Sequence, residues 1–176
     1  MSMRIISALV ENKPGVLTRI SGMFTRRGIN IQSLTVSPCE RDGLSRMTIV
    51  TMSDDRELEK AEKQLNTLVE VVKVSTLHKS SSIVRDLCLV RINVTDVRRR
   101  EAVMQMVSAS GAKIVDVSLN ALTVEIVDEP RKIDKFVEMV RGYGIKQLLR
   151  TGVTAIAMDG ANSGSANGGS VNGGLK

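Results

Sequence analysis

Aromatic residues are almost absent from this 176-residue chain, which has no Trp, one Tyr and two Phe. Single-stranded nucleic acids are usually held by aromatic side chains on which the bases stack, so the composition argues against that class of ligand. The hydrophobic share is 42%, and the core must therefore be built from Val, Ile, Leu and nine Met. No apolar run approaches the roughly 20 residues that a membrane-spanning helix needs. We expect an aliphatic globular core and no membrane partner.

Cysteine is also scarce. Cys39 and Cys88 lie far apart without metal-ligand spacing, so we expect two free thiols. Residues 1–4 lead directly into a strand-like pattern, without the apolar stretch and small-residue cleavage site of a signal peptide. These features predict a cytoplasmic protein.

The motifs of the common enzyme classes are missing as well. The sequence has no Gly-x-Ser-x-Gly elbow, no Gly-x-x-x-x-Gly-Lys-Ser/Thr phosphate loop and no Gly-x-Gly-x-x-Gly after a strand. The one histidine, His78, falls in an expected linker, and Cys and His do not recur at zinc-binding spacing. The acidic pairs Asp54-Asp55 and Asp128-Glu129 stand at expected helix starts, where they complement the helix dipole. We expect neither catalytic residues nor a metal site.

The formal net charge of +6 is spread along the chain and mixed with acidic residues. Its densest basic run, Arg98-Arg99-Arg100, precedes Glu101 and is expected to be a solvated helix start. Such a charge would serve a DNA partner, but the sequence shows no helix-turn-helix pattern. It would equally suit acidic patches on a protein partner.

The apolar periodicity switches between strand and helix spacing in the same order twice. The first half predicts strands at about 3–10, 30–37, 45–52 and 70–77, with one helix from Val16 to Gly28 and another from Asp54 to Leu68. The second half predicts strands at about 85–94, 112–119, 121–128 and 145–157, with helices at about 97–110 and from Pro130 to Val140. The order βαββαβ is that of a ferredoxin-like module. We therefore predict an α+β protein with two ferredoxin-like modules in tandem.

The expected domain boundaries follow from the polar stretches. One module covers 1–78, a polar linker covers 79–84, and the second module covers 85–158. The Gly/Asn/Ser-rich segment 159–176 buries too little apolar surface to offset the entropy of ordering, so we expect a flexible, disordered tail.

The loop between the first strand and the first helix, Asn12 to Leu17, has the properties of a ligand site. A helix N-terminus offers unpaired backbone N–H groups and a partial positive charge, both suited to a carboxylate. Gly15 lacks a Cβ and allows close approach, while the amides of Asn12 and Asn30 suit the ends of an amino acid. Asn30 opens the second strand, which we expect beside the first. Alternatively, these are ordinary turn and loop residues.

The second strand is expected at the edge of its sheet. It is rich in apolar and β-branched residues: Ile29, Ile31, Leu34, Thr35 and Val36. Because such an edge invites pairing with another copy, we predict a homodimer formed by edge-to-edge or helix-to-helix packing. A ligand would then lie between the Asn12–Leu17 loop of one chain and Asn30 of the other, and would bias the dimer geometry.

Four segments together resemble the small regulatory subunit of acetohydroxyacid synthase, also called acetolactate synthase. They are Glu11–Leu17, Arg26–Ile31, Ser33–Val36 and Ser45–Ile49. The Pro-Gly-x-Leu pattern in the first is shared by many ACT domains, and the other three make the resemblance specific. It extends over about residues 1–158, so the first module is expected to be an ACT domain.

The resemblance implies a non-catalytic subunit in branched-chain amino acid biosynthesis. It would activate a large catalytic subunit and confer feedback inhibition by valine or another branched-chain amino acid, as a homodimer or a higher oligomer. Thiamine diphosphate, magnesium and FAD would reside on the large subunit, and none in this chain. The alternatives are an ACT-type transcriptional regulator and an enzyme acting alone. The effector residues that we predict are Asn12, Lys13, Pro14, Gly15, Val16, Leu17, Asn30 and Ile31.

Overall fold

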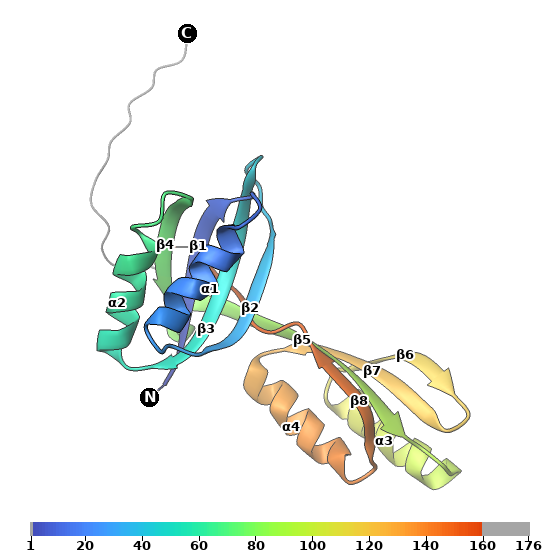
Figure 1. The fold of residues 1–176 in the computed structure, drawn as a ribbon. Coiled ribbons are helices and arrows are strands. Elements are labelled where there is room, and N and C mark those ends of the chain that lie inside the picture. The colour runs from blue at the N-terminus through green and yellow to red at the C-terminus, as the bar shows by residue number, and fades with distance from the viewer. Residues whose placement is uncertain (1, 160–176) are drawn as a thin grey trace.

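The computed structural model describes residues 2–159, which form two lobes connected by one long strand (Figure 1). The first lobe contains β1 (Ser2–Glu11), α1 (Val16–Arg26), β2 (Ile31–Pro38), β3 (Leu44–Ser53), α2 (Asp55–Leu65) and β4 (Val71–Leu77). The second contains β5 (Ser82–Asn93), α3 (Val97–Ala109), β6 (Lys113–Ser118), β7 (Ala121–Asp128), α4 (Pro130–Arg141), β8 (Ile145–Arg150) and β9 (Thr154–Ala157). The α+β class and the tandem βαββαβ order are confirmed. The expected tail lies outside the described residues, apart from Asp159.

The first sheet has the strand order β2-β3-β1-β4, with α1 and α2 on one face (Figure 1). Its core contains Phe24 and otherwise aliphatic and methionine side chains, among them Ile6, Ile20, Met47 and Leu65. The predicted edge position of β2 is confirmed. The prediction that β2 lies beside β1 is wrong, because β2 and β3 form an antiparallel hairpin that inserts β3 between them.

The acidic residues at the helix starts accept hydrogen bonds from backbone N–H groups there, and Asp54 caps α2. Asp54 forms a capping box with Glu57, in which the Glu57 N–H donates to Asp54 Oδ1 at 2.8 Å and the Asp54 N–H donates to Glu57 Oε2 at 3.1 Å. Asp128 Oδ1 accepts from the Glu129 N–H at 2.7 Å, immediately before α4 begins at Pro130. These carboxylates thus have a structural explanation.

The second sheet has the order β6-β7-β5-β8, and α3 and α4 cover one face. Cys88 is fully buried in this core, together with Val90, Val124 and Phe136. Burial raises the pKa of the Cys88 thiol. Cys39 and Cys88 are both free thiols.

Two predicted boundaries need correction. Residues 79–81 form a 3-10 turn, but β5 already begins at Ser82, so 82–84 of the expected linker belong to a strand. The single strand expected at 145–157 is two strands, β8 and β9, which pair with different parts of β5. The break occurs at Gly152, whose φ of +87° is a conformation that strands do not contain.

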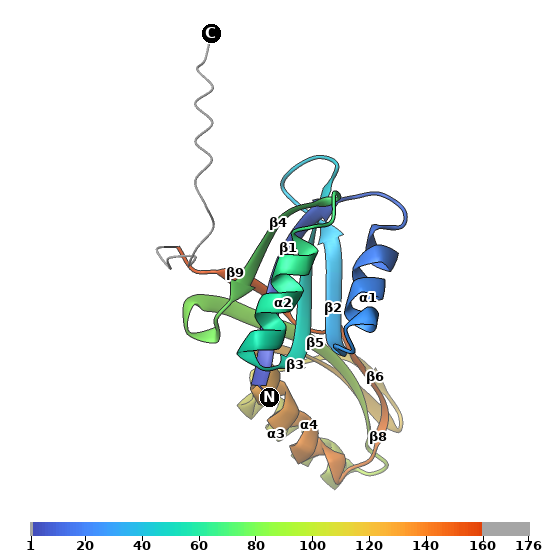
Figure 2. The same ribbon diagram turned by 60° about the vertical axis from the view of Figure 1, so that its left-hand side comes forward.

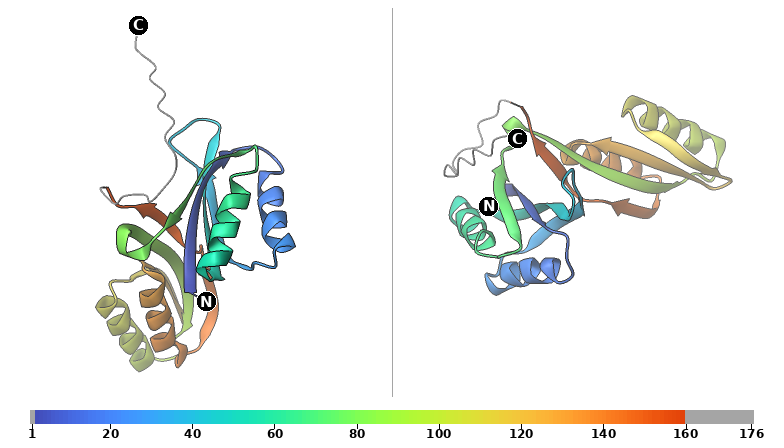
Figure 3. Two further views of the ribbon diagram at one scale, coloured as in Figure 1. Left: turned by 90° about the vertical axis from the view of Figure 1, so that its left-hand side faces the viewer. Right: turned by 90° about the horizontal axis from the view of Figure 1, so that it is seen from above.

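The first half of β5 and β9 pack against the face of the first sheet that the helices leave free (Figure 3). Ile5 and Val50 point to that face because their neighbours in sequence, Ile6 and Ile49, point to the helices. They join Val84, Val153 and Ala155 in a small core between the lobes. Figure 2 shows β9 beside β4 and β1. Within residues 2–159, no helix is long and apolar enough to cross a membrane.

Candidate functional site

The start of α1 presents backbone N–H groups without partners. Gly15 is the N-cap residue with φ +88°, and it provides no side chain to cap the helix. The Asn12 N–H donates to Gly43 O at 2.8 Å and fixes the loop to the β2–β3 connection. Within residues 2–159, no acceptor is found for the backbone N–H groups of Gly15, Leu17 and Thr18. The loop therefore supplies the donors predicted from the sequence.

The surroundings of these donors suit an anion. The first turn of α1 contains no acidic residue. A Cβ placed on Gly15 would meet no atom within 4 Å, so a side chain at this position would have room. The Lys13 ammonium pairs with Glu11 at 2.9 Å, so the charge of this carboxylate is balanced within the loop region. Val16 is buried and anchors the helix start, whereas Leu17 is 47% exposed. A carboxylate would meet a partial positive charge here.

Asn30 and Ile31 lie at the opposite end of the same sheet. Ile31 pairs with Thr51, and Thr51 pairs with Arg4. Arg4 and Asn12 are eight residues apart along the chain, which corresponds to roughly 25 Å of strand. Within one chain the structure therefore separates the two halves of the predicted site, and a small ligand that touched both would have to touch two chains.

The basic run at the start of α3 is engaged within the module. Arg100 Nη2 donates to Ser118 O at 2.9 Å and to Leu119 O at 2.7 Å. Arg99 Nη1 donates to Tyr143 O at 3.4 Å. Two of the three arginines thus fasten α3 to neighbouring turns, a role that the charge run alone did not indicate.

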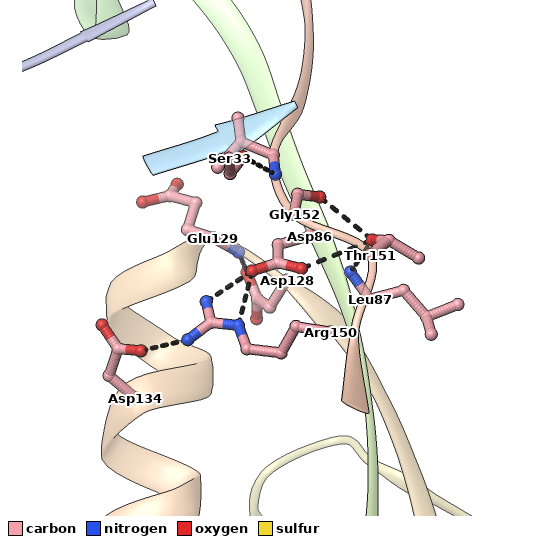
Figure 4. A network of polar contacts seen from close by, with 10 residues as sticks. Ser33, Asp86, Leu87, Asp128, Glu129, Asp134, Arg150, Thr151 and Gly152 are labelled. Carbon is pink, nitrogen blue, oxygen red and sulfur yellow. Dashed lines mark hydrogen bonds and ion pairs between the residues drawn. The ribbon is translucent and has the colours of Figure 1, made fainter. Parts of the chain in front are cut away.

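A buried ion-pair network lies where the two modules meet (Figure 4). Asp86 is 3% exposed, and Arg150 Nε donates to its Oδ2 at 2.7 Å. Arg150 Nη1 donates to Asp134 Oδ1 of α4 at 2.5 Å. Burial lowers the pKa of the Arg150 guanidinium, but the hydrogen bonds to Asp134 and Asp86 outweigh it, so the pKa is raised. Sequence reasoning missed this network because 64 residues separate its main partners.

Residues Thr151–Val153, which we call the strap, connect this network to β2 (Figure 4). The Val153 N–H donates to Ser33 Oγ at 3.1 Å, and Thr35 Oγ1 donates to Val153 O at 3.1 Å. Hollows of about 390 and 440 Å³ flank the strap, and residues of both modules line each of them. Neither hollow is lined by Asn12–Leu17 or by Asn30–Ile31. Across residues 2–159, no group of three or more His, Cys, Asp or Glu side chains could hold a metal ion.

Both modules match known family models. Residues 6–73 match the family described as the AHAS small subunit-like ACT domain. Residues 85–159 match the family described as the small subunit of acetolactate synthase. The two matches divide the chain as its two sheets do.

Relatives similar over most of the chain come from archaea and bacteria. The probable acetolactate synthase small subunit of Methanothermobacter thermautotrophicus is 48% identical over 87% of this chain and 91% of its own length. The acetolactate synthase small subunit of Mycolicibacterium smegmatis is 39% identical over 92% of this chain and 94% of its own length. A crystal structure of the acetolactate synthase small subunit from Thermotoga maritima superposes with a TM-score of 0.83 at 33% identity, covering 89% of this chain and 98% of that one.

Proposed function

Because the chain belongs to the family of acetolactate synthase small subunits, we propose that it binds a branched-chain amino acid, valine foremost, and transmits that signal to a catalytic large subunit. The observation that carries the proposal is the start of α1, where backbone N–H groups have no partner within residues 2–159 and the first helical turn contains no acidic residue. Donors arranged in this way bind carboxylates. The alternative of a transcriptional regulator has no such family support.

The effector site is completed by a second chain. β1 and β2 are both antiparallel to β3 and hence parallel to each other, so Pro38 and the Asn12 loop share one end of the sheet. Antiparallel pairing of β2 with the β2 of a second copy would bring Asn30 of the partner subunit to that end. Such a dimer has two equivalent sites in its seam.

The contacts at each site follow from the groups available. The effector carboxylate accepts from the Leu17 and Thr18 N–H groups, where the helix dipole favours a negative charge. The Asn30 side-chain oxygen of the partner subunit accepts from the effector ammonium. Leu17, which is exposed, and Ile31, which is half-buried, offer apolar surface to a short aliphatic side chain.

Regulation follows from differential binding. The effector prefers one dimer arrangement and the large subunit prefers another, so each weakens binding of the other by the same coupling energy, typically about 1–3 kcal/mol. The large subunit would carry thiamine diphosphate, magnesium and FAD and would catalyse acetolactate formation. This chain supplies no reacting group and instead sets how active that subunit is.

The proposal is tested by mixing the purified chain with a matching large subunit. We expect stimulated acetolactate formation that valine suppresses, and calorimetry should detect uptake of valine by the assembled complex. Parallel titrations with leucine and isoleucine show which of the three amino acids binds most tightly. If none of the three is taken up, the proposed site does not exist. Salt-sensitive DNA binding in place of stimulation would favour the transcriptional regulator.

A further inference from the structure

Strand β2 touches both the proposed effector seam and the second module. Asn30 and Ile31 stand at its start, while Ser33 and Thr35 hydrogen-bond Val153 of the strap. Both bonds lie on the face away from α1, because Leu34 between them packs with the helix-side core. A displacement of β2 must therefore move the strap or break two hydrogen bonds.

The strap approaches β2 more closely than a side chain at Gly152 would allow. A Cβ on Gly152 would lie 2.8 Å from Ser33 Oγ and 3.1 Å from Ser33 Cβ, and its φ is +87°. By contrast, a Cβ on Gly111, with φ +65°, would meet no atom within 4 Å. Gly111 is required by conformation alone, whereas Gly152 is required by conformation and by contact.

The other end of the strap is fixed to the second module. The Thr151 N–H donates to Leu87 O at 3.0 Å, and the Leu87 N–H donates to Thr151 Oγ1 at 3.2 Å. The preceding residue, Arg150, binds Asp86 of β5 and Asp134 of α4 (Figure 4). These contacts hold the strap to β5 and α4, so movement at Val153 is passed on to the second module.

We propose that the strap is the coupling element that carries a displacement of β2 at the effector seam into the second module. This inference rests on the proposed function, since effector binding supplies the displacement. The small core between the modules consists of apolar side chains that include Ile5 and Val84. Such packing is non-directional, so it connects the modules without favouring one path for the displacement. The strap adds directional hydrogen bonds to β2, the edge strand of the first sheet that the proposed effector seam also uses.

Two sets of variants test the strap. Gly152→Ala forces the strap away from Ser33, and its matched control is Gly111→Ala, which imposes similar backbone strain without a clash. Ser33→Ala combined with Thr35→Val removes the two hydrogen bonds with little change of shape. Its control is Ser37→Ala, on the same strand, because within residues 2–159 no hydrogen bond of the Ser37 side chain is found. The second set keeps the test valid if Gly152→Ala folds poorly.

The measurements are valine uptake by calorimetry and hydrogen exchange by mass spectrometry, both on the full chain assembled with its large subunit. We expect strap variants to bind valine at least as tightly as the parent, because loss of the coupling also removes the opposition of the large subunit. The valine-induced change in exchange over α4 and β8 should fall at least fivefold, and the fraction of activity that saturating valine removes should fall with it. The controls should respond like the parent.

The outcomes separate the strap from the proposed function. If the strap variants transmit the valine response unchanged, or if the parent binds valine while α4 and β8 do not respond, the strap is not the coupling element. A parent complex that takes up no branched-chain amino acid overturns the proposed function and, with it, the source of the signal.

Discussion

At the scale of single residues, Gly15 is the most direct probe of the effector site. Its φ of +88° is tolerated by Asp and Asn better than by other side chains, and a Cβ there meets open space. Gly15→Asp should place a carboxylate where the effector carboxylate binds. We predict that feedback by valine is lost while activation of the large subunit is retained.

The matched control is Gly15→Asn, which has the same shape without the charge. Repulsion between two carboxylates about 4 Å apart amounts to roughly 1–4 kcal/mol near a protein surface, so calorimetry should find valine binding at least about tenfold weaker in the Asp variant than in the Asn variant. Equal affinities would mean that the effector carboxylate binds elsewhere.

Asp86 is the residue at which a small change should cost most stability. Its side chain is 2% exposed, and Asp86→Ala would leave the Arg150 guanidinium without its buried partner. Breaking a buried pair costs about 3–5 kcal/mol, and we expect about 2–3 kcal/mol here because Arg150 keeps Asp134 and contact with water. Asp134→Ala removes a carboxylate that is 60% exposed and should cost less than about 1 kcal/mol. Urea unfolding followed by circular dichroism distinguishes the two, and similar losses would contradict the assignment.

At the scale of elements, the start of α4 should make stability depend on pH. The backbone N–H of Glu129 holds the pKa of the Asp128 carboxyl below its ordinary value, and Lys132, at 3.1 Å, acts in the same direction. A carboxyl whose pKa is lower in the folded state stabilises fully above its unfolded pKa, near 3.9, and loses that contribution as the pH falls through the folded value.

The comparison that isolates this contribution is Asp128→Asn. We predict that the variant is roughly 0.3–1 kcal/mol less stable than the parent at pH 6. The difference should shrink below about pH 4 as the parent carboxyl becomes protonated. Thermal unfolding between pH 2.5 and 7 provides the measurement. A difference that stays constant over this range would show that the charge on Asp128 is irrelevant to α4.

The helices and strands could be predicted from the sequence where the apolar periodicity agrees with the residues that are typical of helix ends. The acidic pair Asp54-Asp55 and Pro130 mark helix starts in the sequence as they do in the structure. The split between β8 and β9 could not be predicted in this way, since residues 145–157 contain apolar residues on both sides of the break. Gly152 was a visible signal, but the reason for the turn is contact with Ser33, a residue 119 positions earlier in the chain.

The candidate site shows the same division. The loop of Asn12–Leu17 was predictable because a strand, a glycine and a helix start are local signals. The neighbour of β2 was implied by the predicted ferredoxin-like order, a split βαβ unit in which another strand lies between β1 and β2, and the expectation that β2 lies beside β1 disagreed with that fold. The strap and the Asp86–Arg150 pair depend wholly on tertiary contact, and only the completed fold brings them together.

At the scale of the whole molecule, β2 takes part in two interactions: a proposed one with a second chain at the effector site, and one with the strap. Its outer edge has no strand partner within the described chain, whereas the face away from α1 is bound to the strap. A strand that is free on one side and bound on another can respond to a partner and pass the response on. This arrangement requires a dimer that forms through β2 and leaves the opposite edge strand, β4, outside the seam.

An exposed valine on each edge strand distinguishes the edge that forms this dimer from the edge that does not. Val36 on β2 is 44% exposed, and Val72 on β4, at the other edge of the same sheet, is 54% exposed. Because Lys on an edge strand opposes pairing between sheets, Val36→Lys should raise the dimer dissociation constant at least about tenfold in sedimentation equilibrium. Valine affinity should fall with it, because each site needs both chains, while Val72→Lys should change neither property. A Val36→Lys chain that stays dimeric and binds valine normally would place the seam elsewhere, and Asn30 could then no longer contact the ligand held by Asn12–Leu17.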